Sequence, residues 1–141
     1  MSGPPGAESS WQELTRSDCF ELLARHDLGR LSFLDHLGPI IVPVNYVLDR
    51  YMVVIRSDEG AKLDAADRGI KVAFEIDGFD AARGSGWSVL VRGEAVTVTD
   101  PTELTRLREL PISPLAPGTK SHYIRVMPAM LSGRRILGSE G

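Results

Sequence analysis

Three side chains that could bind an anion gather near the middle of the chain. Arg56 and Ser57 end a predicted strand, and Lys62 follows in the first turn of a short predicted helix. Free backbone N–H groups and the helix dipole favour negative charge at that end of a helix, so a lysine there is best explained by an anion. Guanidinium, ammonium and hydroxyl donors together suit a phosphate. The pattern alone leaves open the alternative of a solvated strand end beside a surface lysine.

Strand periodicity adds to the case for an anion at this position. Met52, Val54 and Arg56 share one face of their strand because side chains alternate. An arginine that follows two apolar positions on one face is typical of a strand end that meets solvent or an anion. Gly60 then relaxes the backbone just before the helix begins. The segment therefore predicts a phosphate-binding site formed by Arg56, Ser57 and Lys62, which we refer to as the phosphate seat.

Two other positions could contact a planar ring. Asn45 lies among β-branched residues, where an amide needs hydrogen-bond partners that a heterocycle edge or a bulge next to Pro43 could supply. Trp87 enters a strand after a predicted loop, and it could stack on a ring or, as is commoner, pack in the core. The three histidines are far apart, and none has a second ligand at metal-binding spacing.

Composition limits the class of protein. A chain of 141 residues with 43% hydrophobic and 25% charged residues suits one soluble globular domain. The net charge of −3 argues against a general nucleic-acid binder, and no apolar run is long enough to cross a membrane. The first residues do not resemble a secretory signal, and a lone cysteine, Cys19, fits a reducing compartment. We expect a cytoplasmic protein.

The elements that must position these residues are mostly strands. A composition rich in Gly, Pro and Ser predicts a disordered tail over 1–12, and apolar periodicity predicts one domain over 13–137. The expected strands are 30–34, 40–48, 51–57, 70–76, 87–100, 123–128 and 131–136, and the expected helices are 16–25, 61–68 and 102–110. Short antiparallel strands without a helical crossover after each one favour a closed barrel over a parallel sheet. The predicted fold is mainly β, an antiparallel barrel with peripheral helices.

Local signals place the turns and irregularities of this barrel. Thr15 and Asp18 form a capping box at the first helix, and Pro43 predicts an edge position or a bulge. A tight hairpin is expected at Asp49–Arg50, and Gly93 permits a bend within a long strand. Composition predicts loops over 77–86 and 111–119.

At these residues the sequence resembles the pyridoxamine 5'-phosphate oxidase-like split-barrel flavoproteins, and most closely their small bacterial branch that includes nitroimidazole-resistance reductases. The resemblance covers about residues 15–136, and the order and spacing of its motifs carry it. These motifs are Cys19-x-x-Leu22-Leu23, Gly29-Arg30-Leu31, Pro43-Val44-Asn45-Tyr46, Gly60-x-Lys62-Leu63, Val72-Ala73-Phe74-Glu75-Ile76-Asp77, Gly86-Trp87-Ser88-Val89, Arg92-Gly93-x-Ala95 and Gly133-Arg134-Arg135.

The resemblance implies a six-stranded antiparallel split barrel that forms a homodimer, with two flavin sites across the subunit interface. It implies that residues 44–46 run beside the isoalloxazine ring, that the basic segment holds the phosphate, and that Trp87 and Ser88 approach from the partner subunit. Arg134 is a weaker candidate. The implied cofactor-binding residues are Val44, Asn45, Tyr46, Arg56, Ser57, Lys62, Leu63, Trp87 and Ser88.

The function implied is that of an FMN-dependent oxidoreductase acting on an unidentified small molecule. The long C-terminal substrate segment of true pyridoxamine phosphate oxidases is missing, so that reaction is not expected. Members of the family divide among FMN, a deazaflavin coenzyme, haem and no cofactor. Two alternatives therefore stay open: a flavin or deazaflavin carrier without turnover, and a cofactor-free dimeric interaction protein. No catalytic residue is assigned, although Tyr46, Tyr123 and His122 could donate a proton.

Overall fold

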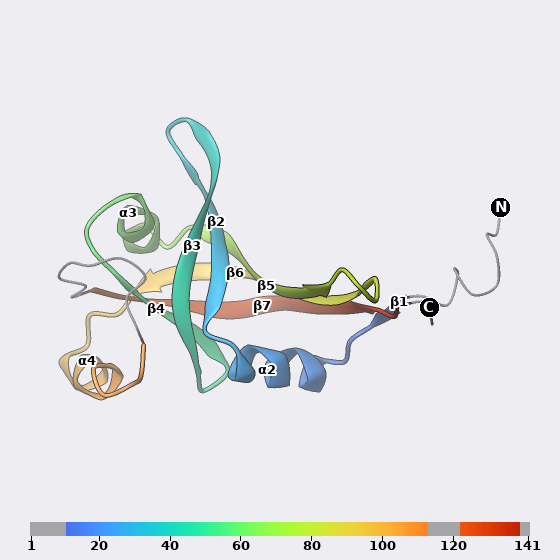
Figure 1. Ribbon diagram of the computed structural model, residues 1–141. Helices are drawn as coiled ribbons and strands as arrows, with labels where there is room; N and C mark the ends of the chain where they lie inside the picture. The colour runs from blue at the N-terminus through green and yellow to red at the C-terminus, as the bar shows by residue number, and fades with distance from the viewer. Residues whose placement is uncertain (1–10, 113–121, 139–141) are drawn as a thin grey trace.

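One antiparallel β-sheet closes on itself to form a barrel (Figure 1). The computed structural model describes residues 11–112 and 122–138. The strand order is β1-β7-β4-β3-β2-β5-β6, and a further pairing of β7 with β6 closes a ring of six strands, with β1 added at the edge of β7. The strands are β1 (Trp11–Glu13), β2 (Leu28–Asp35), β3 (Gly38–Asp49), β4 (Met52–Ser57), β5 (Lys71–Asp80), β6 (Ser85–Thr97) and β7 (His122–Ile136). The predicted six-stranded antiparallel split barrel is confirmed.

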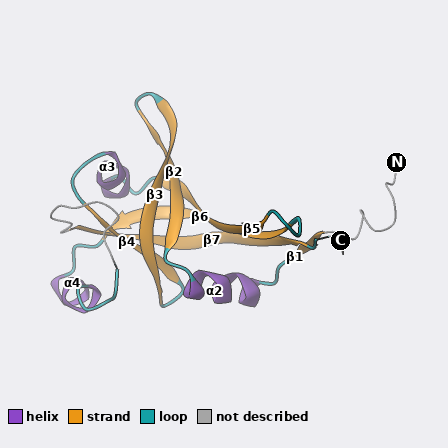
Figure 2. Cartoon of the chain, viewed as in Figure 1, coloured by secondary structure: helices purple, strands orange, loops and turns teal. Residues whose placement is uncertain are grey.

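Three helices lie outside the ring of strands (Figure 2). They are α2 (Arg16–Arg25), α3 (Ala61–Asp67) and α4 (Pro101–Leu107). Helix α2 begins at the predicted capping box, in which the Thr15 hydroxyl accepts from the Asp18 N–H at 3.1 Å. Helix α4 is capped by Asp100 as expected but ends at Leu107, three residues early. In the described part of the chain, none of the helices is both long and apolar enough to cross a bilayer.

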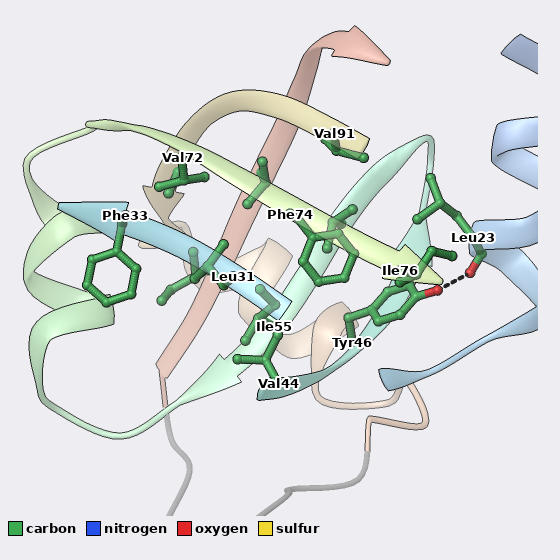
Figure 3. Close-up of a cluster of buried hydrophobic side chains, with 14 of the residues drawn as sticks. Leu23, Leu31, Phe33, Val44, Tyr46, Ile55, Val72, Phe74, Ile76 and Val91 are labelled. Atoms are coloured by element: carbon green, nitrogen blue, oxygen red, sulfur yellow. Dashed lines mark hydrogen bonds between the residues drawn. The ribbon is translucent and has the colours of Figure 1, made fainter. Parts of the chain in front are cut away.

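The barrel interior holds the main core (Figure 3). Tyr46 lies in this core, where its ring meets Phe74 edge to face at 4.9 Å. Its hydroxyl donates to the Leu23 carbonyl at 2.7 Å. This carbonyl lies in the last turn of α2, where backbone acceptors have no partner within the helix. The bond therefore fastens α2 to the barrel. A second cluster of buried side chains packs under α4 and consists of Val54, Val98, Leu107, Ile112 and Tyr123.

Two irregularities fall where the sequence predicts them. At Pro43, β3 is paired with β2 alone, because its pairing with β4 begins at Tyr46. Proline has no N–H to give to a second neighbour, so it suits this edge position. The register of β6 against β7 shifts between Arg92 and Gly93, where a Cβ would meet the Met127 carbonyl oxygen at 1.8 Å. Only glycine fits this bulge.

Four further differences from the expected elements affect the fold. The β3–β4 turn is centred one residue later, on Arg50 and Tyr51, whose φ angles are 51° and 66°. Positive φ at both central residues is what a two-residue type I′ turn requires. The expected tail contributes Trp11 and Gln12 to β1, because they pair with the end of β7. The two expected C-terminal strands form one continuous β7.

The fourth difference concerns the expected loop at 77–86, which is mostly strand. Strand β5 runs to Asp80 and β6 begins at Ser85. The three glycines in this segment suggested a loop, but two of them lie across from an aromatic ring, Gly78 from Trp87 and Gly86 from Phe79. The rings fill the space that side chains would otherwise occupy. The other expected loop, 111–119, lies largely outside the described residues.

Candidate functional site

The turn between β4 and α3 carries the two cations of the predicted phosphate seat. Arg56 is half-buried near the end of β4, with its guanidinium 5.7 Å from the ring centre of Tyr123, its cross-strand neighbour on β7. Lys62 is half-buried and is the second residue of α3. Between them Gly60 has a φ of 147°, and nothing lies within 4 Å of where its Cβ would be. The cations thus bracket a turn with open space beside it.

The sheet register brings Asn45 to the same place. Tyr46 and Ile55 form the last pair between β3 and β4 at this end, and Asn45 and Arg56 are the next residues of the two strands. Arg56 in turn pairs with Tyr123 on β7. Asn45 therefore lies at the strand ends where Arg56 meets Tyr123. The predicted hairpin had already placed Asn45 on the strand next to Arg56.

Ser57 does not share the face of Arg56. Its side chain is on the same side of β4 as Val53 and Ile55, which belong to the barrel core. Ser57 is 1% exposed, and its hydroxyl donates to the Asp58 carbonyl at 2.7 Å. Of the three residues predicted to hold a phosphate, only the two cations therefore border the turn, and the serine hydroxyl faces the opposite side of β4.

Three more of the predicted residues have their side chains in the core: Val44, Tyr46 and Leu63. Alternation along β3 sends residues 44 and 46 inward and leaves Asn45 facing outward, so residues 44–46 cannot act as one contact surface. Burial raises the pKa of the Tyr46 hydroxyl, and the Asp27 carboxylate adds to this effect. Tyr46 is therefore poorly suited to donate protons to a bound molecule. Tyr123, another predicted donor, is buried under α4.

Trp87 and Ser88 lie far from the seat within one chain. On β7, Arg56 pairs with Tyr123 and Trp87 pairs with Arg135, twelve positions further along. At ~3.3 Å per residue this is about 40 Å. Figure 1 shows β7 extending from β4 and α3 at one end to β1 at the other. Trp87 is half-buried, and its ring lies 4.7 Å from that of His26.

A charged cluster on the outward face of β2 and β5 escaped the sequence analysis. The Arg30 guanidinium lies 3.4 Å from the Glu75 carboxylate and 3.2 Å from that of Asp77. The pKa of Glu75 is raised to about 7, chiefly by burial and then by the Asp77 carboxyl, with Arg30 partly opposing both. The position of Glu75 inside the apolar run 70–76 could have indicated a charged cluster. Its partner Arg30 could not be identified, because it lies on β2, far away in the sequence. Arg134, the weaker candidate, lies over the Trp11 ring at 5.6 Å.

Comparison with known proteins identifies the family. A family model described as pyridoxamine 5'-phosphate oxidase matches residues 15–135. The chain belongs to the pyridoxamine 5'-phosphate oxidase family. This match covers nearly every described strand and helix, including both cations of the seat.

Relatives of this pyridoxamine 5'-phosphate oxidase family member include proteins of known structure. An FAD-binding protein of Mycobacterium smegmatis is 34% identical with a TM-score of 0.75, over 89% of this chain and 98% of that one. A candidate pyridoxamine 5'-phosphate oxidase of Corynebacterium glutamicum is 30% identical with a TM-score of 0.82, over 94% and 98%. An uncharacterized protein of Mycobacterium tuberculosis is 35% identical over 130 residues, 89% of this chain and 85% of its own length.

Proposed function

We propose that this protein binds a flavin, with FMN as the first candidate, and acts as an oxidoreductase on a small molecule. The observation that carries the proposal is the pair of cations, Arg56 and Lys62, on either side of the β4–α3 turn. The family and the FAD-binding relative at 34% identity support it. That relative also makes FAD the second candidate.

The residues present fit a flavin phosphate through direct contacts. A guanidinium and an ammonium are the usual protein partners of phosphate oxygens, and Gly60 leaves room beside the turn. Asp58 and Glu59 belong to the same turn, so their two negative charges balance the positive charges of Arg56 and Lys62. The net electrostatic field of the turn therefore does not attract an anion by itself. The two cations must therefore touch the phosphate, with Asn45 next to Arg56 as a donor or acceptor for polar groups further along the cofactor.

A bound flavin supplies hydride or electron transfer, and the protein has to position it and exclude water. Asn45 and Arg56 would fix its orientation from two neighbouring strands. Because the hydroxyl of Tyr46 is bonded inside the core, we assign it no proton transfer. The acid or base for the substrate remains unassigned in this proposal.

We further propose a homodimer in which each site is completed by the partner. Trp87 and Ser88 lie about 40 Å along β7 from the seat, too far to reach a flavin held by the same chain. Two copies related by a two-fold axis bring each Trp87 to the other copy's seat.

A double variant tests the seat. Arg56→Ala with Lys62→Ala should weaken FMN binding by about 100-fold or more, because each charge-assisted hydrogen bond contributes about 1.5–3 kcal/mol. The matched control, Arg68→Ala with Arg108→Ala, removes the same charge from two exposed positions and should bind like the parent. Isothermal titration measures both, and thermal unfolding checks that both fold. A seat variant that binds FMN as tightly as the parent contradicts the proposal.

The same titration distinguishes the cofactors and the alternatives. Tighter binding of FAD or of a deazaflavin than of FMN would replace FMN in the proposal. Bound flavin that is reduced by a nicotinamide and reoxidised by a small acceptor supports an oxidoreductase. Bound flavin without such turnover supports a carrier instead.

A further inference from the structure

The hairpin that joins β2 to β3 projects from the barrel, as Figure 1 shows. We refer to residues 33–41 as the hairpin arm. Leu37 at its tip is 85% exposed, the most exposed large apolar side chain in the described part of the chain. The Leu37 N–H donates to the Asp35 carboxylate at 2.8 Å, and Gly38 has a φ of 117°. The tip is therefore a defined turn that presents an apolar side chain to its surroundings.

A groove of about 670 Å³ lies beside the base of this arm, where β6 bulges at Gly93. We refer to it as the bulge groove. Its exposed apolar walls come from β2, the end of β6 and the middle of β7, and they are Leu34, Val96, Met127 and Met130. Large apolar side chains gathered around a concave site are typical of a surface that another molecule covers.

The charges of the two features are complementary. Lys71 and Arg92 line the bulge groove, and neither forms an ion pair with any residue that the structure describes. Asp35 at the arm tip likewise has no cationic partner among the described residues. Glu94 in the groove can face His36 of a tip. An acidic, apolar tip thus matches a basic, apolar groove.

We propose that the hairpin arm of one copy packs into the bulge groove of a second copy of this chain. Leu37 would lie against Met127 and Met130, with Asp35 beside Lys71 or Arg92. The arm cannot fill its own groove, because Leu34 and Pro39 at its base already form one wall. In a two-fold dimer both arms and both grooves are used at once. The inference rests on the dimer of the proposed function and is independent of the flavin.

The dimer dissociation constant of the full chain, measured by sedimentation equilibrium, tests whether the hairpin arm contributes to the interface. Leu37→Asp should raise this constant by about 100-fold or more, because two buried leucine contacts are lost per dimer. Leu37→Met keeps an apolar side chain and should stay within a few-fold of the parent. Tyr51→Asp changes an exposed residue in the turn at the other end of β3, and should leave the constant unchanged.

A cross-link tests the contact itself. Chains with Leu37→Cys are mixed with chains with Met130→Cys under mild oxidation, and the native Cys19 is buried and does not compete. We expect a disulfide between the two different chains, and far less when Tyr51→Cys replaces Leu37→Cys. The inference holds if this cross-link forms and Leu37→Asp weakens the dimer.

Different results would overturn the arm contact, the proposed dimer and the proposed flavin binding. A dimer that tolerates Leu37→Asp overturns the arm contact, assigns the groove to another occupant such as a small apolar ligand, and leaves the proposed dimer standing. A parent protein that is a monomer at all concentrations overturns both the arm contact and the shared site. FMN binding, measured in the same samples, reports on the flavin proposal separately.

Discussion

Glu75→Gln should change how stability depends on pH. In the folded protein, burial and the nearby Asp77 carboxylate raise the pKa of Glu75 to about 7, against an ordinary value of 4.5. Between these two values the folded chain binds more protons than the unfolded chain. Stability therefore falls as pH rises through this window. Glutamine stays neutral at every pH, so the stability of the variant should not show this decrease with rising pH.

The magnitude follows from the interval between the two pKa values. From 4.5 to about 7 it corresponds to at most about 3.5 kcal/mol, at ~1.4 kcal/mol per pH unit. The Glu75 side chain is 33% exposed, so solvent screening lowers this to about 1–2 kcal/mol. We expect the variant to be more stable than the parent by about that amount at pH 8, and similar to it at pH 5.

Urea unfolding of the flavin-free protein, followed by tryptophan fluorescence at pH 5, 6, 7 and 8, measures this difference. The protomer concentration is held fixed because association contributes to stability. Glu109→Gln is the matched control, since Glu109 is an exposed glutamate outside both the charged cluster and the bulge groove. The reasoning is refuted if the stability difference between Glu75→Gln and the parent does not change from pH 5 to pH 8.

Two further variants test the packing around the site. Tyr46→Phe removes the hydroxyl that donates to the Leu23 carbonyl and should cost about 1–2 kcal/mol in chemical unfolding, while FMN affinity stays within a few-fold. A large loss of affinity without loss of stability would return Tyr46 to the binding surface. Arg106→Met removes the bidentate partner of Asp49, at 2.9 and 2.8 Å, and strands a carboxylate that is 10% exposed. It should lower the thermal unfolding midpoint at pH 7 relative to the parent. Arg106 lowers the pKa of Asp49, so the parent keeps this stability above the unfolded pKa of about 4 and loses it as pH falls through the lower folded value. The variant should show no such loss, and an equal acid sensitivity in both proteins would contradict this account.

The fold could be predicted from the sequence wherever local chemistry decides it. The Thr15–Asp18 capping box, the Asp100 cap and the bulge at Gly93 all depend on residues close together in the chain, and each is confirmed. The expected loop at 77–86 was wrong because Gly78 and Gly86 make room for rings on the opposite strand. Such cross-strand packing is set by register, which composition does not reveal.

In the candidate site, too, the local features could be predicted from the sequence and the contacts between distant strands could not. Arg56 and Lys62 could be picked out because they flank one short turn, and strand alternation could have separated Ser57 from Arg56 and Asn45 from its two neighbours. The link from Arg56 to Tyr123, and that from Arg30 to Glu75, cross between strands far apart in the chain. Their meeting depends on how the barrel closes. The distance from the seat to Trp87 likewise emerged only from the shared partner, β7.

The most direct test of the central claim is the visible absorption spectrum of the purified protein, taken after incubation with FMN, FAD or a deazaflavin and removal of free ligand by gel filtration. We predict retained flavin bands at one cofactor per chain, which are lost in the Arg56→Ala, Lys62→Ala double variant and kept in the Arg68→Ala, Arg108→Ala control. A colourless parent protein that retains none of the three would contradict the flavin proposal.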